Sequence, residues 1–64
     1  MVNSNRYTDI EARVRAAGYN LGQFFAAAEL DRSTWTRWRN GETGPTLRNW
    51  ERVQDTINEL EAAK

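Results

Sequence analysis

The chain has 64 residues, of which nine are Lys or Arg and nine are Asp or Glu, so its formal net charge is zero, and it contains neither Cys nor His. This length allows a single small domain over residues 1–64. The lack of Cys excludes disulfides and thiolate metal sites. Neither a membrane span nor a signal peptide is evident, which predicts a cytoplasmic protein. Catalysis is excluded as well, because a nucleophile would here need Ser, Thr or Lys beside a carboxylate base and no spacing supports one, so we predict no enzyme, cofactor, metal ion or small-molecule ligand.

The first helix is predicted to begin at Thr8, where Thr8-Asp9-Ile10-Glu11 fits a capping box, and to end at Gly18. Apolar residues recur along it at helical spacing, which predicts one buried stripe. The stripe consists of Ile10, Val14 and Ala17, whereas Arg13 and Arg15 are predicted to face solvent.

Two short helices follow, joined by a tight turn at Leu30 and Asp31. Asn20 is a candidate N-cap for the second helix, and Asp31 is one for the third, because short polar side chains accept the free amide hydrogens of a first helical turn. The third helix is predicted over Arg32 to Asn40, where Gly41 supplies a left-handed stop. The apolar positions of the second helix are Leu21, Phe24, Phe25 and Ala28.

The two faces of the third helix differ in chemistry. Trp35 and Trp38 are three residues apart and share one face, which predicts that this face is buried. An aromatic inner face combined with a polar outer face suits insertion into a DNA groove. The residues on or beside the outer face are Arg32, Ser33, Thr36, Arg37 and Asn40.

The last helix is predicted over residues 46–62. Thr46 follows the loop Glu42-Thr43-Gly44-Pro45 and is a candidate N-cap. No breaker interrupts the chain from there to Ala63. Apolar residues recur at spacings of three and four, and this stripe consists of Leu47, Trp50, Val53, Ile57 and Leu60.

The apolar stripe of the last helix divides into two parts by its distance from the third helix. Leu47, Trp50 and Val53 lie close in sequence to the third helix, so we predict that they pack on it and join the core. Ile57 and Leu60 lie further along, and we predict that they form a homodimer interface, at least on DNA. No segment alternates with period two, so the predicted fold class is all-α, with four or five short helices.

Ten residues of the middle of the chain resemble the helix-turn-helix of the phage repressor and Cro-like (XRE-type) family. They are Phe24, Ala28, Leu30, Ser33-Thr34-Trp35, Arg37-Trp38, Gly41 and Pro45. The resemblance covers roughly residues 21–57 and implies a lambda-repressor-like domain with its helix-turn-helix at about 21–41. As function it implies a phage or prophage repressor, a Cro-like protein or an antitoxin-type autoregulator.

Two positions depart from the family pattern. Phe25 stands where the family usually has a small residue, and Glu29 stands where it usually has Gly at the turn. Two outcomes are open for Glu29. It adopts a left-handed conformation, which costs a non-glycine residue about 1–2 kcal/mol, or the turn differs locally.

The predicted partner is double-stranded DNA with a palindromic operator, read by the third helix in the major groove. The predicted base contacts are Arg32, Ser33, Thr36 and Arg37, since a guanidinium fits the two acceptors on the edge of guanine; the alternative for both Arg is an ordinary solvated helix face. Trp38 and Thr46 have second interpretations, as a core residue and as a helix cap. The predicted phosphate contacts are Asn20, Leu21, Trp38, Asn40, Thr43, Thr46 and Arg48.

Zero net charge weighs against nucleic-acid binding, although residues 32–52 hold five Arg against two Glu. One alternative is therefore a helical protein-interaction module, antitoxin-like or an adaptor, that has lost DNA binding. Glu29 and Glu42 favour it. Another is the DNA-binding domain of a longer repressor, because the ending Glu61-Ala62-Ala63-Lys64 would suit a helix cut in mid-course.

Overall fold

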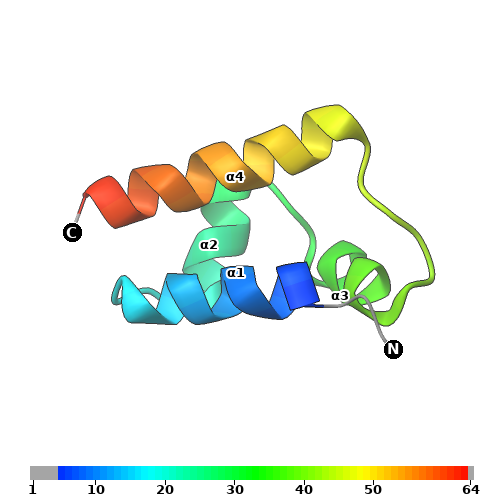
Figure 1. The fold of residues 1–64 in the computed structure, drawn as a ribbon, viewed down its shortest axis with the longest axis horizontal. Coiled ribbons are helices and arrows are strands. Elements are labelled where there is room, and N and C mark those ends of the chain that lie inside the picture. Colours follow the sequence, from blue (N-terminus) through cyan, green and yellow to red (C-terminus); the bar gives the residue numbers. More distant parts are fainter. Residues whose placement is uncertain (1–4, 64) are drawn as a thin grey trace.

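The computed structural model describes residues 5–63 and contains four α-helices in that range. They are α1 (Asn5–Ala16), α2 (Leu21–Ala28), α3 (Arg32–Asn40) and α4 (Leu47–Ala62). No strand occurs among these described residues, so the all-α fold class is confirmed, with four helices (Figure 1). No helix among them is long and apolar enough to cross a membrane.

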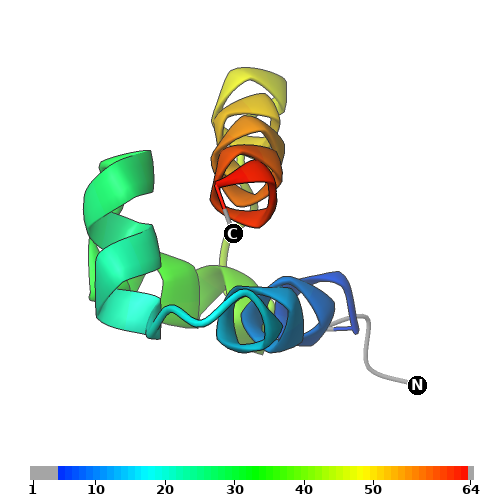
Figure 2. The same cartoon turned by 90° about the vertical axis from the view of Figure 1, so that its left-hand side faces the viewer.

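Helices α1 and α4 lie side by side and run in the same direction (Figures 1 and 2). Near their N-terminal ends the rings of Tyr7 and Trp50 have centroids 5.7 Å apart, and near their C-terminal ends Arg13 and Glu61 form an ion pair of 2.7 Å. Helix α2 lies to one side of this pair, and α3 lies at the end where α1 begins. The two short helices thus pack against the pair formed by α1 and α4.

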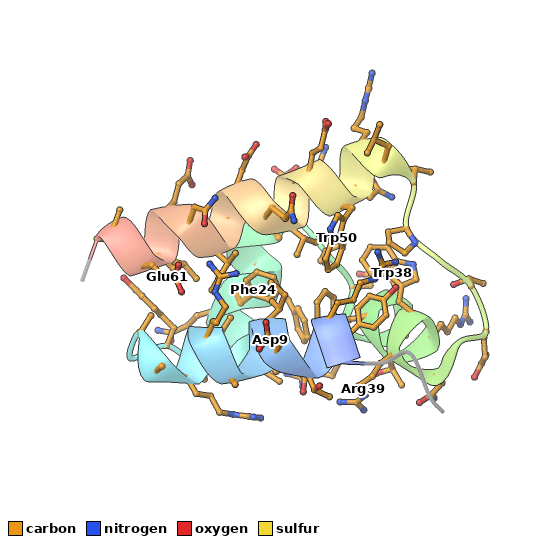
Figure 3. The ribbon with its side chains drawn as sticks, in the orientation of Figure 1. Asp9, Phe24, Trp38, Arg39, Trp50 and Glu61 are labelled. Carbon is orange, nitrogen blue, oxygen red and sulfur yellow. The ribbon has the colours of Figure 1, made fainter. Side chains whose placement is uncertain are left out.

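The core is built around Trp35, which is 1% exposed. The ring centroids of Tyr7 from α1 and Phe24 from α2 lie 5.4 and 5.6 Å from that of Trp35, both in edge-on orientation. Trp38, Phe24 and Trp50 point into the space between the helices (Figure 3). Such aromatic pairs contribute about 0.5–1.5 kcal/mol each beyond the area they bury. Because the cluster takes rings from every helix, it fixes α3 relative to the other three.

The predicted start of the first helix at Thr8 is wrong. Helix α1 begins earlier, at Asn5, so Thr8 lies inside it and cannot cap it. The reason is that the buried stripe starts at Tyr7, which is 5% exposed and packs on Trp35. Glu11, which the sequence assigned to the capping box, is itself buried and faces α3.

The boundaries of α2 follow local signals. The side-chain oxygen of Asn20 accepts a hydrogen bond from the backbone N–H of Gln23 (2.8 Å), and the N–H of Asn20 donates to the side-chain oxygen of Gln23 (2.9 Å). This reciprocal capping box confirms Asn20 as the N-cap. At the other end Glu29 has φ 57° and ψ 46°, so of the two outcomes left open for this turn the left-handed one holds.

The predicted bounds of α3 are confirmed, Arg32 to Asn40. Asp31 has the extended backbone of an N-cap residue, but its side chain forms no capping hydrogen bond. Gly41 ends the helix with φ +82°, a conformation that glycine adopts without a steric penalty. The N–H groups of Gly41 and Glu42 donate to carbonyls of the last turn, at 3.1 and 2.9 Å.

Helix α4 begins after Thr46, whose hydroxyl oxygen accepts from the N–H of Asn49 at 3.1 Å, so the predicted cap is confirmed. The prediction that Leu47 joins the core is wrong, because it is 75% exposed. In Figure 1 the N-terminal ends of α1 and α4 diverge, and the rings of Tyr7 and Trp50 meet between them. Leu47 lies one turn before Trp50, beyond the neighbouring helices.

The predicted dimer interface is also wrong at Ile57, which is completely buried within one chain. Leu60 is half-buried and packs against the same core. The cause is that α1 and α2 both pack on α4, and α1 accompanies α4 as far as the pair of Arg13 with Glu61. No second copy is needed to remove Ile57 from water.

Candidate nucleic-acid interface

Helix α3 has one face fixed in the protein and one face turned to solvent. Trp35 and Trp38 are buried on the inner face. Of the predicted base contacts, Arg32, Ser33 and Arg37 are exposed. Thr36 is half-buried, and its hydroxyl donates to the backbone carbonyl of Arg32 at 3.0 Å. The side chains of Ser33 and Arg37 are therefore free, whereas the Arg32 guanidinium lies over the Phe25 ring, 5.4 Å from its centroid. Thr36 keeps its methyl group and its oxygen lone pairs.

The inner face of α3 is bound to α1 through Glu11. The indole N–H of Trp35 donates to Glu11 Oε2 at 2.8 Å, and Arg39 Nη1 donates to the same oxygen at 3.0 Å. Glu11 is 6% exposed, so these two donors replace water around a buried carboxylate. The sequence holds a signal for this, since Glu11 lies four residues after Tyr7 and three before Val14, on the apolar stripe of α1.

The described residues contain three ion pairs, and they leave several arginines unpaired. The pairs join Arg13 to Glu61 (2.7 Å), Arg39 to Glu11 (3.0 Å) and Arg52 to Glu29 (3.5 Å). Local positive charge is therefore available to an anionic partner although the net charge is zero. The arginines that form no ion pair within residues 5–63 are Arg6, Arg15, Arg32, Arg37 and Arg48.

An open pocket of about 490 Å³ lies at the start of α2. Two cationic side chains, of Arg15 and Arg32, line it together with Leu21 and Gly22. The first N–H groups of a helix have no helical carbonyl to donate to, and they favour a negative charge. A Cβ on Gly22 would lie 3.3 Å from Asn20 Oδ1, the oxygen that caps α2, so glycine leaves room for this cap.

The predicted phosphate contact of Asn20 needs a correction. Its backbone N–H, which was expected to bind the anion, already donates to the side chain of Gln23 in the capping box. Asn20, Leu21 and Gly22 all line the pocket, and Leu21 and Gly22 are the first two residues of α2. Because this hydrogen is already used in the cap, we expect the N–H groups of Leu21 and Gly22 to bind a phosphate instead.

The other predicted phosphate contacts lie at the opposite end of α3. Asn40 is its exposed last residue, Thr43 lies in the loop that follows, and Arg48 is exposed on the first turn of α4. The loop from α3 to α4 is visible on the right of Figure 1. Trp38 is 4% exposed and belongs to the core, which leaves almost none of it for a phosphate. Candidate phosphate contacts therefore stand at both ends of α3 rather than in one patch.

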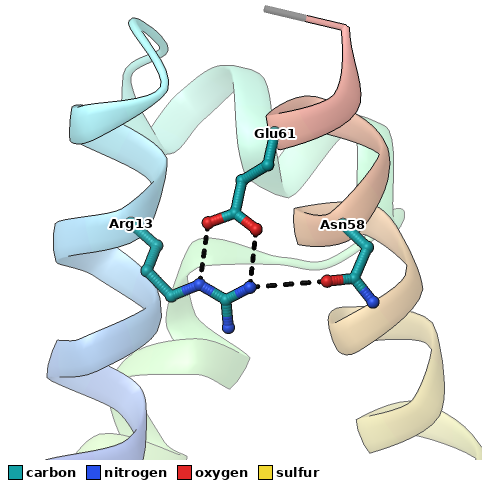
Figure 4. A network of polar contacts seen from close by, with 3 residues as sticks. All are labelled: Arg13, Asn58 and Glu61. Atoms are coloured by element: carbon teal, nitrogen blue, oxygen red, sulfur yellow. Dashed lines mark hydrogen bonds and ion pairs between the residues drawn. The ribbon is translucent and has the colours of Figure 1, made fainter.

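Arg13 belongs to a separate network that joins α1 to α4 (Figure 4). Its Nε and Nη2 donate to the two carboxylate oxygens of Glu61 at 2.9 and 2.7 Å, and Nη2 lies 3.4 Å from Asn58 Oδ1. The hydrogen bond with Arg13 lowers the pKa of Glu61, and the same bond raises the pKa of Arg13. Arg13 was predicted to be solvated, but it is tied to α4 and half-buried.

Within the described part of the chain, no group of three or more His, Cys, Asp or Glu side chains is placed to hold a metal ion. No protein-family model, no curated protein sequence and no solved structure gives a significant match to the chain. The observations that bear on function are therefore the arrangement of the two faces of α3 and of the arginines around it.

Proposed function

We propose that this chain is a sequence-specific regulator that binds double-stranded DNA with α3 in the major groove. The observation that carries the proposal is the division of α3 into two faces. Trp35 and Trp38 hold one face in the core. On the other face the side chains of Ser33 and Arg37 are exposed and form no hydrogen bond or ion pair within residues 5–63. A rigid helix that presents a guanidinium and short polar groups can approach base edges closely.

The charges around α3 support the same function. Arg32 lies at its first turn beside the α2 pocket, and Arg48 follows the loop after its last turn. Cations at both ends of a groove-binding helix can contact the two phosphate backbones that border the groove. Asp31 and Glu42 flank the same helix and reduce the local field, so we expect weak binding to unrelated DNA.

The resemblance to the phage repressor and Cro-like family extends this proposal to a phage or prophage repressor or an antitoxin-type autoregulator. Such a regulator must share a compartment with the DNA that it binds, so the proposal includes a cytoplasmic location for the protein. A homodimer on a palindromic operator remains part of it. Its interface must lie outside Ile57, which is buried within the chain, so we expect a weak dimer that assembles on DNA.

Selection of binding sites from a pool of random duplex DNA tests the proposal. We expect one enriched sequence, bound about 10³-fold or more tightly than an unrelated duplex at physiological salt. Arg37→Ala and Arg48→Ala serve as a matched pair, since each removes one exposed arginine. Arg37→Ala should relax the preference at one base pair, whereas Arg48→Ala should weaken binding to all duplexes and lower the salt slope by about 0.9. A pool without any enriched sequence contradicts the proposal.

A helical protein-interaction module that has lost DNA binding is the second candidate. The favouring observation is the outer surface of α4, where Leu47 is 75% exposed and Glu51, Asp55 and Glu59 are exposed at four-residue spacing. Such a surface repels DNA and suits a partner with basic and apolar side chains. Under this alternative Arg37→Ala has no effect on any binding, and substitutions at Leu47 and Asp55 abolish binding of the partner.

A further inference from the structure

One carboxylate oxygen of α1 holds two successive turns of α3. Trp35 and Arg39 are four residues apart, so their side chains leave the same side of α3 one turn apart. Both donate to Oε2 of Glu11, at 2.8 and 3.0 Å. Glu11 is itself 6% exposed and sits on a helix whose stripe is anchored by Val14, which is fully buried. The acceptor is thus a fixed point for α3.

We propose that Glu11 is a positioning residue, which sets the rotation of α3 about its own axis and thereby aims the side chains that read bases. Because base reading by α3 is itself proposed above, this role rests on that function. The burial of apolar surface at Trp35 is non-directional, and the edge-on ring pairs constrain α3 only in part. The two hydrogen bonds to Glu11 are directional, so they add a further constraint on the rotation of α3.

A small rotation is enough to matter. Side-chain tips lie about 5–6 Å from a helix axis, so turning α3 by about 20° moves them by about 2 Å. Hydrogen bonds to a base edge require heavy-atom distances of about 2.7–3.2 Å, so such a shift breaks them. Phosphate contacts through long, flexible arginines tolerate the shift better. A misaligned α3 therefore loses discrimination between sequences before it loses attraction to DNA.

The ionised side chain at Glu11 is needed for the second of the two anchors. A glutamine at this position can still accept from the indole N–H of Trp35, but it carries no charge to hold the guanidinium of Arg39. Arg39 is about two-fifths exposed, so it can turn to solvent once its partner is neutral. Glu11→Gln thus keeps the bond to Trp35 and releases the turn of α3 that carries Arg39.

The chain supplies a control that is matched in charge. Glu61 also forms an ion pair between helices, with Arg13 of α1, but it links α1 to α4 and does not touch α3 (Figure 4). Glu11→Gln and Glu61→Gln each remove one negative charge, so both raise non-specific attraction to phosphates by a similar amount. Any difference in sequence discrimination between the two variants is therefore attributed to the orientation of α3.

The experiment compares the two variants by two measurements. The first is the ratio of affinity for the selected duplex to affinity for an unrelated duplex, which should fall about tenfold in Glu11→Gln and stay unchanged in Glu61→Gln. The second is the orientation of α3 relative to α1 in the free protein, from amide residual dipolar couplings, which should change in Glu11→Gln alone. If the dipolar couplings and the affinity ratio of Glu11→Gln equal those of Glu61→Gln, the proposal is overturned.

Two further outcomes are separable. A wild-type protein without sequence preference contradicts the proposed function, and the couplings then decide the role of Glu11 on their own. If Glu11→Gln does not fold, Arg39→Gln removes the same anchor and leaves the Trp35 bond in place. It should lower the ratio, and Arg39→Lys, which restores a charge opposite Glu11, should recover most of it. A wild-type ratio and unchanged couplings in Arg39→Gln refute the positioning role.

Discussion

The two faces of α3 belong to the same nine residues but have opposite surroundings. On the inner face Trp35 is 1% exposed, touches rings from α1 and α2 and donates to a buried carboxylate. On the outer face Arg37 is exposed and has no ion pair within the described residues. The contrast shows that one helix carries two chemically different faces, of which the inner one is held by burial and hydrogen bonds and the outer one is open to solvent.

The largest effect is expected on the inner face. Trp35→Ala removes the ring at the centre of the aromatic cluster and leaves Glu11 without one of its donors. Deleting a buried Trp side chain typically costs about 3–5 kcal/mol, and a domain of this size has little more in total, so the variant should be largely unfolded. Near-UV circular dichroism and urea denaturation measure this. Ser33→Ala on the outer face is the control and should keep the wild-type midpoint.

An intermediate effect is expected on the outer face. Arg37→Ala should cost about 1–3 kcal/mol of affinity for the selected duplex and relax the preference at one base pair. The urea midpoint should stay close to that of the wild-type protein, because the side chain is exposed and unpaired. Titration of the selected duplex and of its single-base variants measures this. Equal losses on every duplex would assign Arg37 to a phosphate instead.

A smaller effect is expected at the turn that leads into α3. Glu29 is the one non-glycine residue with positive φ among the described residues, and its pair with Arg52 is long and exposed, so it contributes little. Glu29→Gly should relieve the left-handed strain and raise the free energy of unfolding by up to about 1 kcal/mol, despite the greater freedom of glycine in the unfolded chain. Urea denaturation measures this. Glu29→Ala keeps the strain and should show no gain.

The parts of this fold that the sequence predicts are those set by neighbours along the chain. Asn20, Gly41 and Thr46 mark helix ends through bonds that span only three or four residues, and all three boundaries are confirmed. Helical spacing likewise separates the buried tryptophans of α3 from its polar face. Both signals act within one or two turns, so they can be read without knowing the tertiary structure.

The predictions that fail depend on which helix lies beside which. Leu47 and Ile57 belong to one apolar stripe, yet Leu47 is 75% exposed and Ile57 is fully buried. The difference comes from the tertiary structure, in which α1 and α2 both pack on α4. The role of Glu11 is of the same kind, because its partners Trp35 and Arg39 lie on α3, more than twenty residues away. For the candidate site, spacing identifies the outer face, but tertiary contacts decide which arginines remain unpaired.

The smallest effect is expected far from α3, at the pair of Arg13 with Glu61. Because the hydrogen bond from Arg13 lowers the pKa of Glu61 in the folded protein, folding favours the ionised carboxylate. The contribution to stability is therefore complete above the pKa of an unfolded glutamate, about 4.3, and is lost as the pH falls through the lower folded value. The side chains are about two-fifths exposed, so solvent screens the pair and the effect is small.

Denaturation midpoints of the wild-type protein and Glu61→Gln, measured from about pH 7 down to about pH 3, test this pair. The wild-type protein should be the more stable at neutral pH, and the difference should disappear on acidification, because protonated Glu61 is then equivalent to the neutral glutamine. A difference that stays constant with pH would mean that the substituted glutamine is disfavoured for its shape and not for its lack of charge. The ratio of affinity for the selected duplex to affinity for an unrelated duplex should be the same in both proteins at neutral pH, because the network joins α1 to α4 and leaves the orientation of α3 to Glu11.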